Sequence, residues 1–346
     1  MRKQFKCDLL QTYILTYICP IMSSVLLTGG AGFIGSNLVR VFLEDSRIKK
    51  VRILDNFSTG FHENLEELRT HPRLEIITGD ICDFETCRQA MTGMELVCHQ
   101  AALGSVPRSI AHPLATHESN VNGTLHIYEA ARQAGIRRIV YAASSSTYGD
   151  STSLPKVEDQ IGKPLSPYAV TKYVMELYAD VYARVYGMEF IGLRYFNVFG
   201  PRQSPKGAYA AVIPIFMQAM LSGQSPVING DGSFSRDFTF IDNVIDANLK
   251  ALFCTDTRAL NQVYNIAYGE STTLLQLFEM IRELSGSTLQ PQLGPSRNGD
   301  IPHSLASIEK AKQLLGYEPR VSIREGLARA FSWYQKQYQS QMTSVS

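Results

Sequence analysis

The chain has 346 residues, 45% hydrophobic and 19% charged, with 33 lysines and arginines against 32 aspartates and glutamates. This length exceeds one average domain of about 150 residues and is ample for a buried core. The near-zero net charge argues against a general basic surface for nucleic acid. No apolar run reaches the roughly 18 uncharged residues of a membrane span, so composition indicates a soluble globular protein.

Six cysteines lie at positions 7, 18, 82, 87, 98 and 254, without a CxxC pair. They are too sparse for a disulfide scaffold, so we expect a cytoplasmic protein and no metal site. Arg2 and Lys3 precede an apolar segment that imitates a signal peptide, but polar residues interrupt this segment and no cleavage site follows. We expect residues 1–23 to be an extension and Met22 to be the working start.

Strands and helices alternate through the first 200 residues. Apolar runs and helical spacing predict strands at 24–28, 51–54, 74–77, 96–98, 139–142 and 189–193, and helices at 33–44, 116–133 and 168–186. Apolar strands that alternate with helices indicate a parallel sheet covered on both faces. We therefore predict an α/β fold, with a Rossmann-type doubly wound parallel sheet over 24–200. A smaller C-terminal α/β substrate domain over 201–346 returns in part to that sheet.

Residues 28–35 read TGGAGFIG, in which Gly30, Gly32 and Gly35 satisfy G-x-G-x-x-G between a strand and a helix. Asp55 ends the next strand twenty residues after Gly35, which completes a dinucleotide fingerprint. The helix N-terminus directs its amides at a pyrophosphate. A carboxylate at Asp55 would bond the adenosine ribose and repel a 2′-phosphate, so NAD is favoured over NADP.

Asp80 follows the third predicted strand. It is either a partner of the adenine amino group or the N-cap of a helix that begins near Phe84.

A second motif combines the serine-rich strand end at 144–149, SSSTYG, with Tyr168 and Lys172 in the next helix. The spacing of four puts both side chains on one helix face, where the ammonium would lower the pKa of the tyrosine. An unperturbed phenol titrates near 10, so a base poised near pH 7 needs a shift of about 3 units.

These motifs resemble the extended short-chain dehydrogenase/reductase family of nucleotide-sugar enzymes, from about Val25 to Tyr338. The strings HQAALGSVPRS (99–109), YAASSSTYGD (141–150), LSPYAVTKY (165–173) and LRYFNVFGPRQ (193–203) are similar to its UDP-N-acetylglucosamine 4-epimerase branch. The resemblance implies that Tyr168 takes the C4 hydroxyl proton while hydride passes from C4 to NAD. A bound 4-keto sugar then turns over and hydride returns to its opposite face. Lys172 holds the nicotinamide ribose, and Ser144 or Ser145 hydrogen-bonds O4.

Motif and resemblance together give two sets of binding residues. The predicted cofactor-binding residues are Gly29, Gly32, Phe33, Ile34, Gly35, Asp55, Asn56, Ser58, Thr59, Gly60, Asp80, Ile81, Gln100, Ala101, Ala102, Tyr168 and Lys172. The predicted substrate-binding residues are Gly104, Ser105, Ser144, Ser145, Tyr168, Asn197, Ala211, Val212, Asn229, Arg236, Arg297, Asp300 and Ser304. Asn197, Arg236 and Arg297 match family positions that grip the diphosphate.

Positions at which this sequence differs from other members of the family indicate which reaction and which sugars to expect. The string RNGDIPHS (297–304) ends at Ser304, where the resemblance implies that a tyrosine restricts the pocket to plain hexoses and a small residue admits a 2-acetamido group. Ser146 and Thr147 stand where nucleotide-sugar dehydratases and decarboxylases place an acid, which disfavours those reactions. We therefore expect UDP-N-acetylglucosamine and UDP-N-acetylgalactosamine to be substrates, together with UDP-glucose and UDP-galactose.

Two alternatives remain open. The enzyme could epimerise a UDP-hexuronate or its N-acetylated form, with Arg108 or Arg297 at the carboxylate. The chain could instead be a catalytically idle NAD-binding regulatory protein, although the intact set of Ser144, Tyr168 and Lys172 argues against this. The resemblance also implies a homodimer formed through the helices at 116–133 and 168–186.

Overall fold

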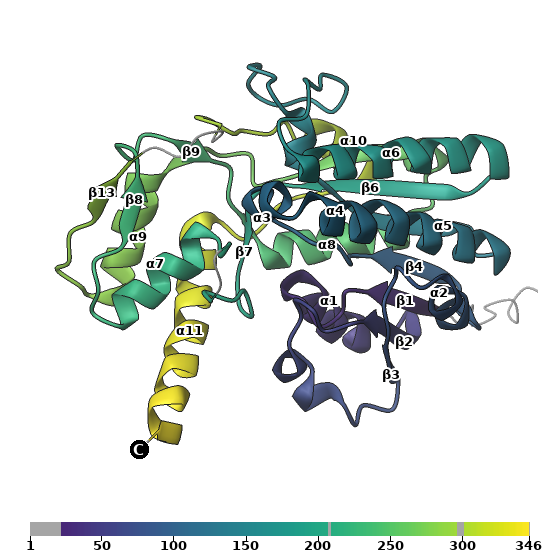
Figure 1. Cartoon of the computed structure of the whole chain (residues 1–346), viewed down its shortest axis with the longest axis horizontal. Coiled ribbons are helices and arrows are strands. Elements are labelled where there is room, and N and C mark those ends of the chain that lie inside the picture. The colour runs from purple at the N-terminus through teal and green to yellow at the C-terminus, as the bar shows by residue number, and fades with distance from the viewer. Residues whose placement is uncertain (1–21, 207–208, 296–300, 346) are drawn as a thin grey trace, which may run out of the picture.

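The computed structural model describes residues 22–206, 209–295 and 301–345. Its larger lobe is built on a seven-stranded sheet in which every neighbouring pair is parallel (Figure 1). The strands lie in the order β11 (Gln262–Ile266), β6 (Glu189–Tyr195), β5 (Arg138–Ser144), β4 (Leu96–His99), β1 (Ser23–Thr28), β2 (Ile48–Asp55) and β3 (Leu74–Thr78). The order 3-2-1-4-5-6 is that of a doubly wound Rossmann sheet, so the predicted fold class is confirmed.

Helices cover both faces of this sheet. On one face lie α1 (Phe33–Glu44) and α8 (Ile241–Leu252); on the other lie α2 (Phe84–Met91), α5 (Gly123–Gln133) and α6 (Pro167–Tyr186). Within β1, Val25 and Leu27 join the hydrophobic cluster of the first face and Leu26 joins that of the second. Burial on both faces is the physical reason for the uniformly apolar strands.

The predicted elements differ from the observed ones mainly at their ends. β1 begins at Ser23, inside the stretch that we expected to be an extension, while residues 1–21 lie outside the described residues. The helix predicted at 116–133 begins earlier, as α4 (Pro113–His117), and reaches α5 through a π-helical turn, Glu118–Asn122. After residue 200 the chain returns to the sheet through α8 and β11.

The smaller lobe lies at the left of Figure 1. It contains α7 (Val212–Leu221), α9 (Leu274–Ser285) and α11 (Ile323–Val345), with the strand pairs β8 (Val227–Asn229)–β13 (Gln292–Gly294) and β9 (Ser235–Arg236)–β12 (Thr272–Thr273). The remaining elements are α3 (Val106–Ala111), α10 (Glu309–Leu315), the pair β7 (Val198–Phe199)–β10 (Thr239–Phe240), and 3-10 turns at His62–Asn64, Glu66–Leu68, Ser145–Tyr148 and Thr257–Ala259. In the described part of the chain no helix is long and apolar enough to cross a membrane.

A buried ion pair joins α6 to β6. Arg194 Nε and Nη2 donate to Glu176 Oε1 and Oε2 at 2.9 and 2.7 Å, and Nη1 donates to the carbonyl of Glu158 at 2.8 Å. The two charged side chains are only 4% and 6% exposed. Removal of one partner would leave the other as an uncompensated buried charge, which costs far more than the loss of a surface pair.

We expect Glu176→Gln to lower the free energy of unfolding by roughly 3–5 kcal/mol, because Arg194 keeps its charge. The matched control is Asp180→Asn, one turn further along α6, whose pair with Arg184 is exposed and should contribute little. Denaturant unfolding of both variants measures the difference. Equal effects of the two substitutions would contradict this account of the pair.

Candidate active site

The turn after β1 brings three backbone segments unusually close. Gly29 has φ +70°, and its N–H donates to the carbonyl of Leu54 at 2.9 Å. A Cβ on Gly35 would lie 2.1 Å from the Gly29 carbonyl oxygen, and a Cβ on Gly29 would lie 2.8 Å from Ala101 Cα. Only glycine allows these approaches, so the glycine motif forms a tight turn between β1 and α1.

A first cavity opens at the carboxyl ends of β1 to β4, where the strand order reverses and ligands of doubly wound sheets bind. It brings together all of the predicted cofactor-binding residues except Tyr168 and Lys172. The lining is Gly29, Gly32, Phe33, Ile34, Gly35, Leu54, Asp55, Asn56, Ser58, Thr59, Gly60, Gly79, Asp80, Ile81, Gln100, Ala101, Ala102, Leu103, Gly104 and Ser119. A glycine cradle at the start of α1, with acidic side chains further along, fits a dinucleotide.

Asp55 stabilises the local backbone in addition to its predicted contact with the adenosine ribose. Its Oδ2 accepts from Ala31 N and its Oδ1 from Phe57 N, both at 2.8 Å. Burial raises the pKa of Asp55, and these two hydrogen bonds oppose that rise. The carboxylate therefore joins the glycine-rich turn to the segment after β2 while it lines the first cavity.

Asp80 also lines the first cavity. Burial acts to raise its pKa, but hydrogen bonds from Cys82 N and Asn56 Nδ2, at 2.8 and 2.7 Å, outweigh burial and lower it. The N-cap of α2 is Asp83, which accepts from Glu85 N. The alternative interpretation of Asp80 as the helix N-cap is therefore wrong.

The predicted catalytic residues meet where β5 ends against α6. Lys172 Nζ lies 5.9 Å from the centroid of the Tyr168 ring and donates to the carbonyl of Ala142 at 2.7 Å. The side chain of Ser144 lies close enough to Tyr168 to act on its pKa, and it accepts from Ser146 Oγ at 2.8 Å. Of the two serines left open by the sequence, Ser144 contacts the tyrosine, whereas Ser145 lines a neighbouring cavity.

The electrostatics of this set differ from our expectation. Burial raises the pKa of Tyr168, and the hydrogen bond with Ser144 opposes the rise. Burial lowers the pKa of Lys172 to about 8, against an opposing effect of Glu176. The prediction that Lys172 lowers the pKa of Tyr168 is therefore wrong for the chain by itself, because burial dominates both groups and the ammonium bonds the Ala142 carbonyl.

Part of the predicted substrate set lines two further cavities between the lobes, whereas Gly104 lines the first cavity and Ser144 and Tyr168 line none of the three. The second cavity is lined by Ser105, Pro107, Asn197, Val198, Phe199, Gln203, Tyr209, Ala210, Ala211, Val212, Ile213, Ile215, Asn229, Arg236, Phe238 and Leu274. The third cavity is lined by Val106, Pro107, Ile110, Ser145, Ser146, Tyr148, Gly149, Lys156, Leu165, Ser166, Ala169, Phe196, Asn197, Arg236, Ile301, His303 and Ser304. The two adjoin because they share Pro107, Asn197 and Arg236.

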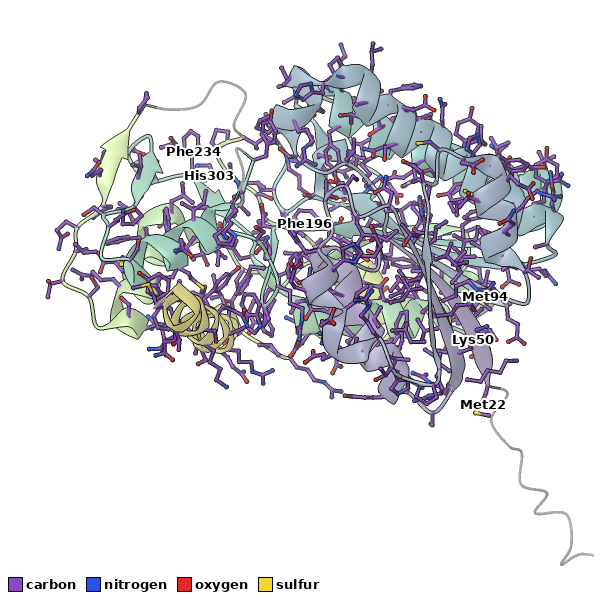
Figure 2. All side chains as sticks on the ribbon, turned by 60° about the horizontal axis from the view of Figure 1, so that its bottom comes forward. Met22, Lys50, Met94, Phe196, Phe234 and His303 are labelled. Carbon is purple, nitrogen blue, oxygen red and sulfur yellow. The ribbon has the colours of Figure 1, made fainter. Side chains whose placement is uncertain are left out.

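The third cavity lies at the junction of the lobes. Figure 2 shows Phe196 between them and His303 on the side of the smaller lobe. Arg108, which the hexuronate alternative invoked, lies with its guanidinium 5.4 Å from the centroid of the Tyr209 ring. Arg297 and Asp300 lie outside the described residues.

The sequence interpretation missed three polar residues near these cavities: Asn120, Lys156 and Gln203. Asn120 lies in the π-helical turn, an irregularity that often marks functional sites. Its side chain accepts from Leu103 N at 2.7 Å and donates to the Leu103 carbonyl and Thr171 Oγ1, both at 3.1 Å. It therefore fixes the lining loop of the first cavity to the helix that carries Tyr168.

His99, at the end of β4, is fully buried between Thr28 Oγ1 at 2.7 Å and Thr124 Oγ1 at 3.0 Å. Burial lowers its pKa to about 3, so the ring stays neutral at physiological pH.

Comparison with known proteins agrees with this geometry. The model of the NAD dependent epimerase/dehydratase family matches residues 25–267. The chain belongs to this family. A putative UDP-glucose 4-epimerase of Methanocaldococcus jannaschii is 39% identical over 89% of this chain and 97% of its own length.

Two solved structures are also similar. The UDP-glucose 4-epimerase of Thermotoga maritima with UDP-glucose has a TM-score of 0.85 and 36% identity, over 91% of this chain and 99% of its own. The UDP-N-acetylglucosamine 4-epimerase of Methanobrevibacter ruminantium in complex with UDP-N-acetylmuramic acid has a TM-score of 0.86 and 38% identity, with the same coverage. The chain is therefore an NAD-dependent isomerase, and the residues of the first cavity would hold NAD.

We expect Gly35→Ala to lower the amount of NAD bound by the purified protein by at least about tenfold, because the new methyl group would collide with the Gly29 carbonyl. The control is Gly93→Ala, at a distant turn with φ +74°, where the added Cβ meets no heavy atom within 4 Å but strains the backbone, so it reports the effect of strain away from the cavity. Chromatography of nucleotide released from each folded variant measures occupancy. Full NAD content in Gly35→Ala would contradict the assignment of the first cavity.

Proposed function

We propose that this family member is a UDP-sugar 4-epimerase that interconverts UDP-N-acetylglucosamine and UDP-N-acetylgalactosamine and also accepts the plain hexose pair. The observation that carries the proposal is the set of Tyr168, Ser144 and Lys172 near a third cavity whose described lining has no carboxylate and includes Ser304. The names of the similar proteins support UDP-sugar 4-epimerisation as the reaction class, and Ser304 supports the 2-acetamido sugar.

Each residue of the set has a task in that reaction. When bound, NAD supplies the hydride acceptor and donor. Tyr168 takes the proton of the C4 hydroxyl, and Ser144, which lies close to Tyr168, positions that hydroxyl. Lys172, whose pKa burial lowers to about 8, keeps most of its positive charge at neutral pH and would hold the nicotinamide ribose.

The nucleotide end of the substrate is bound by polar groups, whereas the sugar end is held only loosely. Asn197 and Arg236 line both the second and the third cavity, which is the place for a diphosphate between uridine and sugar. The third cavity has a largely apolar wall that includes Val106, Ile110 and Phe196. A sugar held loosely there can turn over while the nucleotide stays bound.

The strand-end motif favours epimerisation over elimination. Ser146 lines the third cavity, and Thr147 is fully buried with its hydroxyl donating to the carbonyl of Ser144 at 2.8 Å. Neither side chain can serve as the general acid that dehydration of the sugar requires.

We expect Tyr168→Phe to retain NAD but to lower kcat for UDP-N-acetylglucosamine by roughly 10²–10⁴, the usual effect of losing a general base. The control is Tyr173→Phe on the same helix, which should turn over normally. Steady-state rates by NMR, with NAD content measured in parallel, provide the test. A Tyr168→Phe variant with near-normal kcat would assign the base to another group.

We expect Ser304→Tyr to lower the ratio of kcat/KM for UDP-N-acetylglucosamine to that for UDP-glucose by at least about tenfold. The reason is that the larger side chain would occupy the space of the acetamide in the third cavity, whose wall at Ser304 is fixed by the bond from its N–H to the Ser235 carbonyl at 3.1 Å. Rates with both sugars on one preparation give the ratio. An unchanged ratio would remove Ser304 as the selecting residue.

We also propose that the protein is a cytoplasmic homodimer, as its cysteine usage and the family resemblance imply. Val170, Leu177, Val181 and Val185 are 41% to 64% exposed and form one apolar stripe along α6. Light scattering should give twice the chain mass of 38.6 kDa, and Leu177→Glu combined with Val181→Glu should give the monomer mass. A wild-type monomer at micromolar concentration would refute the dimer.

A further inference from the structure

A fourth cavity lies between the lobes, and the proposed reaction does not use it. It is bounded by α1 and the turns after β2 in the larger lobe, by the loop at 200–206, and by α11, the yellow helix of Figure 1. Its volume of about 790 Å³ lies within the range of small-molecule sites, roughly 300–1,000 Å³. Its described lining shares Gln203 with the second cavity and no residue with the first or the third.

Arg202 lies in this cavity with most of its hydrogen-bond donors unused. Its side chain is 19% exposed, and its Nη1 donates to Asn37 Oδ1 at 2.9 Å. The contact from Nη2 to Glu67 Oε1 is 3.7 Å long, which exceeds a good hydrogen bond. A guanidinium has five N–H donors, so the described residues leave most of this group for a ligand.

The carboxylates of the lining do not give this arginine a partner of its own. Glu67 is 65% exposed and accepts from Arg40 Nε at 2.9 Å, and Arg40 is the main reason that the pKa of Glu67 is lowered. Glu66 pairs with Arg69 at 3.1 Å, and Glu63 is exposed to solvent. The two arginines of the cavity therefore share one solvated carboxylate.

The fold holds the guanidinium of Arg202 where its charge is disfavoured. Burial, and then the neighbouring Arg40, lower the pKa of Arg202 to about 10, so the side chain stays charged at neutral pH. Its backbone is held at φ +69°, and Asn37 Nδ2 donates to the carbonyl of Pro201 at 3.0 Å. An anion stabilises a cation that is buried and incompletely paired, and a guanidinium is suited to bidentate binding of phosphate.

Another wall of the cavity is aromatic. Trp333, Tyr334, Gln337 and Tyr338 line it from one face of α11. Tyr334 is buried and its hydroxyl donates to the carbonyl of Gln203, whereas Trp333 and Tyr338 are only partly buried. Partly exposed aromatic side chains offer a surface on which a nucleobase can stack.

We propose that the fourth cavity is a second ligand site, which binds a nucleotide with its phosphate at Arg202 and its base against Trp333 and Tyr338. The proposal goes beyond the epimerase reaction and does not depend on it. A phosphate accepts charge-assisted hydrogen bonds from the unused donors, while the base covers the partly exposed aromatic surface. Because Gln203 lines both cavities, the nucleotide would lie next to the wall of the second cavity.

Trp333 is the only tryptophan of the chain, so its fluorescence reports on this cavity. The test titrates NAD-loaded protein with AMP, GMP, CMP and UMP in saturating UDP, which competes with them for the second cavity. At least one of the four should change the emission saturably, with a Kd below about 1 mM. The corresponding nucleoside and inorganic phosphate should each bind at least about tenfold more weakly, because each makes only part of the contacts.

Arg202→Gln should raise that Kd by at least about tenfold, because it removes both the charge and the fork of donors. Arg202→Lys, which keeps the charge without the fork, should recover part of the affinity. The matched control is Arg258→Gln, 77% exposed in a 3-10 turn and outside the described lining of the cavity, which should leave the Kd unchanged.

Several results would overturn the proposal. The wild-type titration does so by itself if none of the four nucleotides gives a saturable change up to about 10 mM. A Kd that folded Arg202→Gln leaves unchanged, a nucleoside or phosphate that binds as tightly as the nucleotide, or binding that UDP abolishes would do so as well. Epimerisation by wild type is measured separately, so failure of this site and failure of the proposed function are distinguishable.

Discussion

The carboxyl edge of the parallel sheet is the constraint on which the site depends. Parallel strands present all of their carboxyl ends at one edge, and in this chain the functional segments leave from it in sequence: the glycine turn after β1, Asp55 at the end of β2, Asp80 after β3 and Ser144 at the end of β5. Such a sheet is stable only with both faces covered, which requires apolar strands and helices on both sides. The architecture that places the cofactor thus also dictates the β-α alternation of the sequence.

Local spacing explains why much of this edge could be predicted from the sequence. The glycine motif and Asp55 need only one strand-turn-helix unit and the next strand, and Tyr168 and Lys172 need only one helix. The third cavity is different, because Ser145, Phe196 and Ser304 come from separate segments that meet only when the lobes pack. The burial of Lys156 could not be predicted from the sequence, because a lysine in a polar loop is normally exposed and only the fold buries this one.

The same limit explains the wrong expectation for the pKa of Tyr168. Helical spacing predicts that two side chains share a face, but it does not predict how much water surrounds them. In the folded chain burial is the largest influence on the pKa of both Tyr168 and Lys172. Lys172 has Glu176 one turn further along α6 to support its charge.

The most direct measurement incubates the purified protein with UDP-N-acetylglucosamine in D₂O, without added cofactor, and follows the sugar by NMR. The account predicts that UDP-N-acetylgalactosamine forms and carries no deuterium at C4, because the hydrogen that leaves C4 returns to it without exchange with water. Deuterium at C4, or the absence of any epimer from a protein that retains NAD, would contradict it.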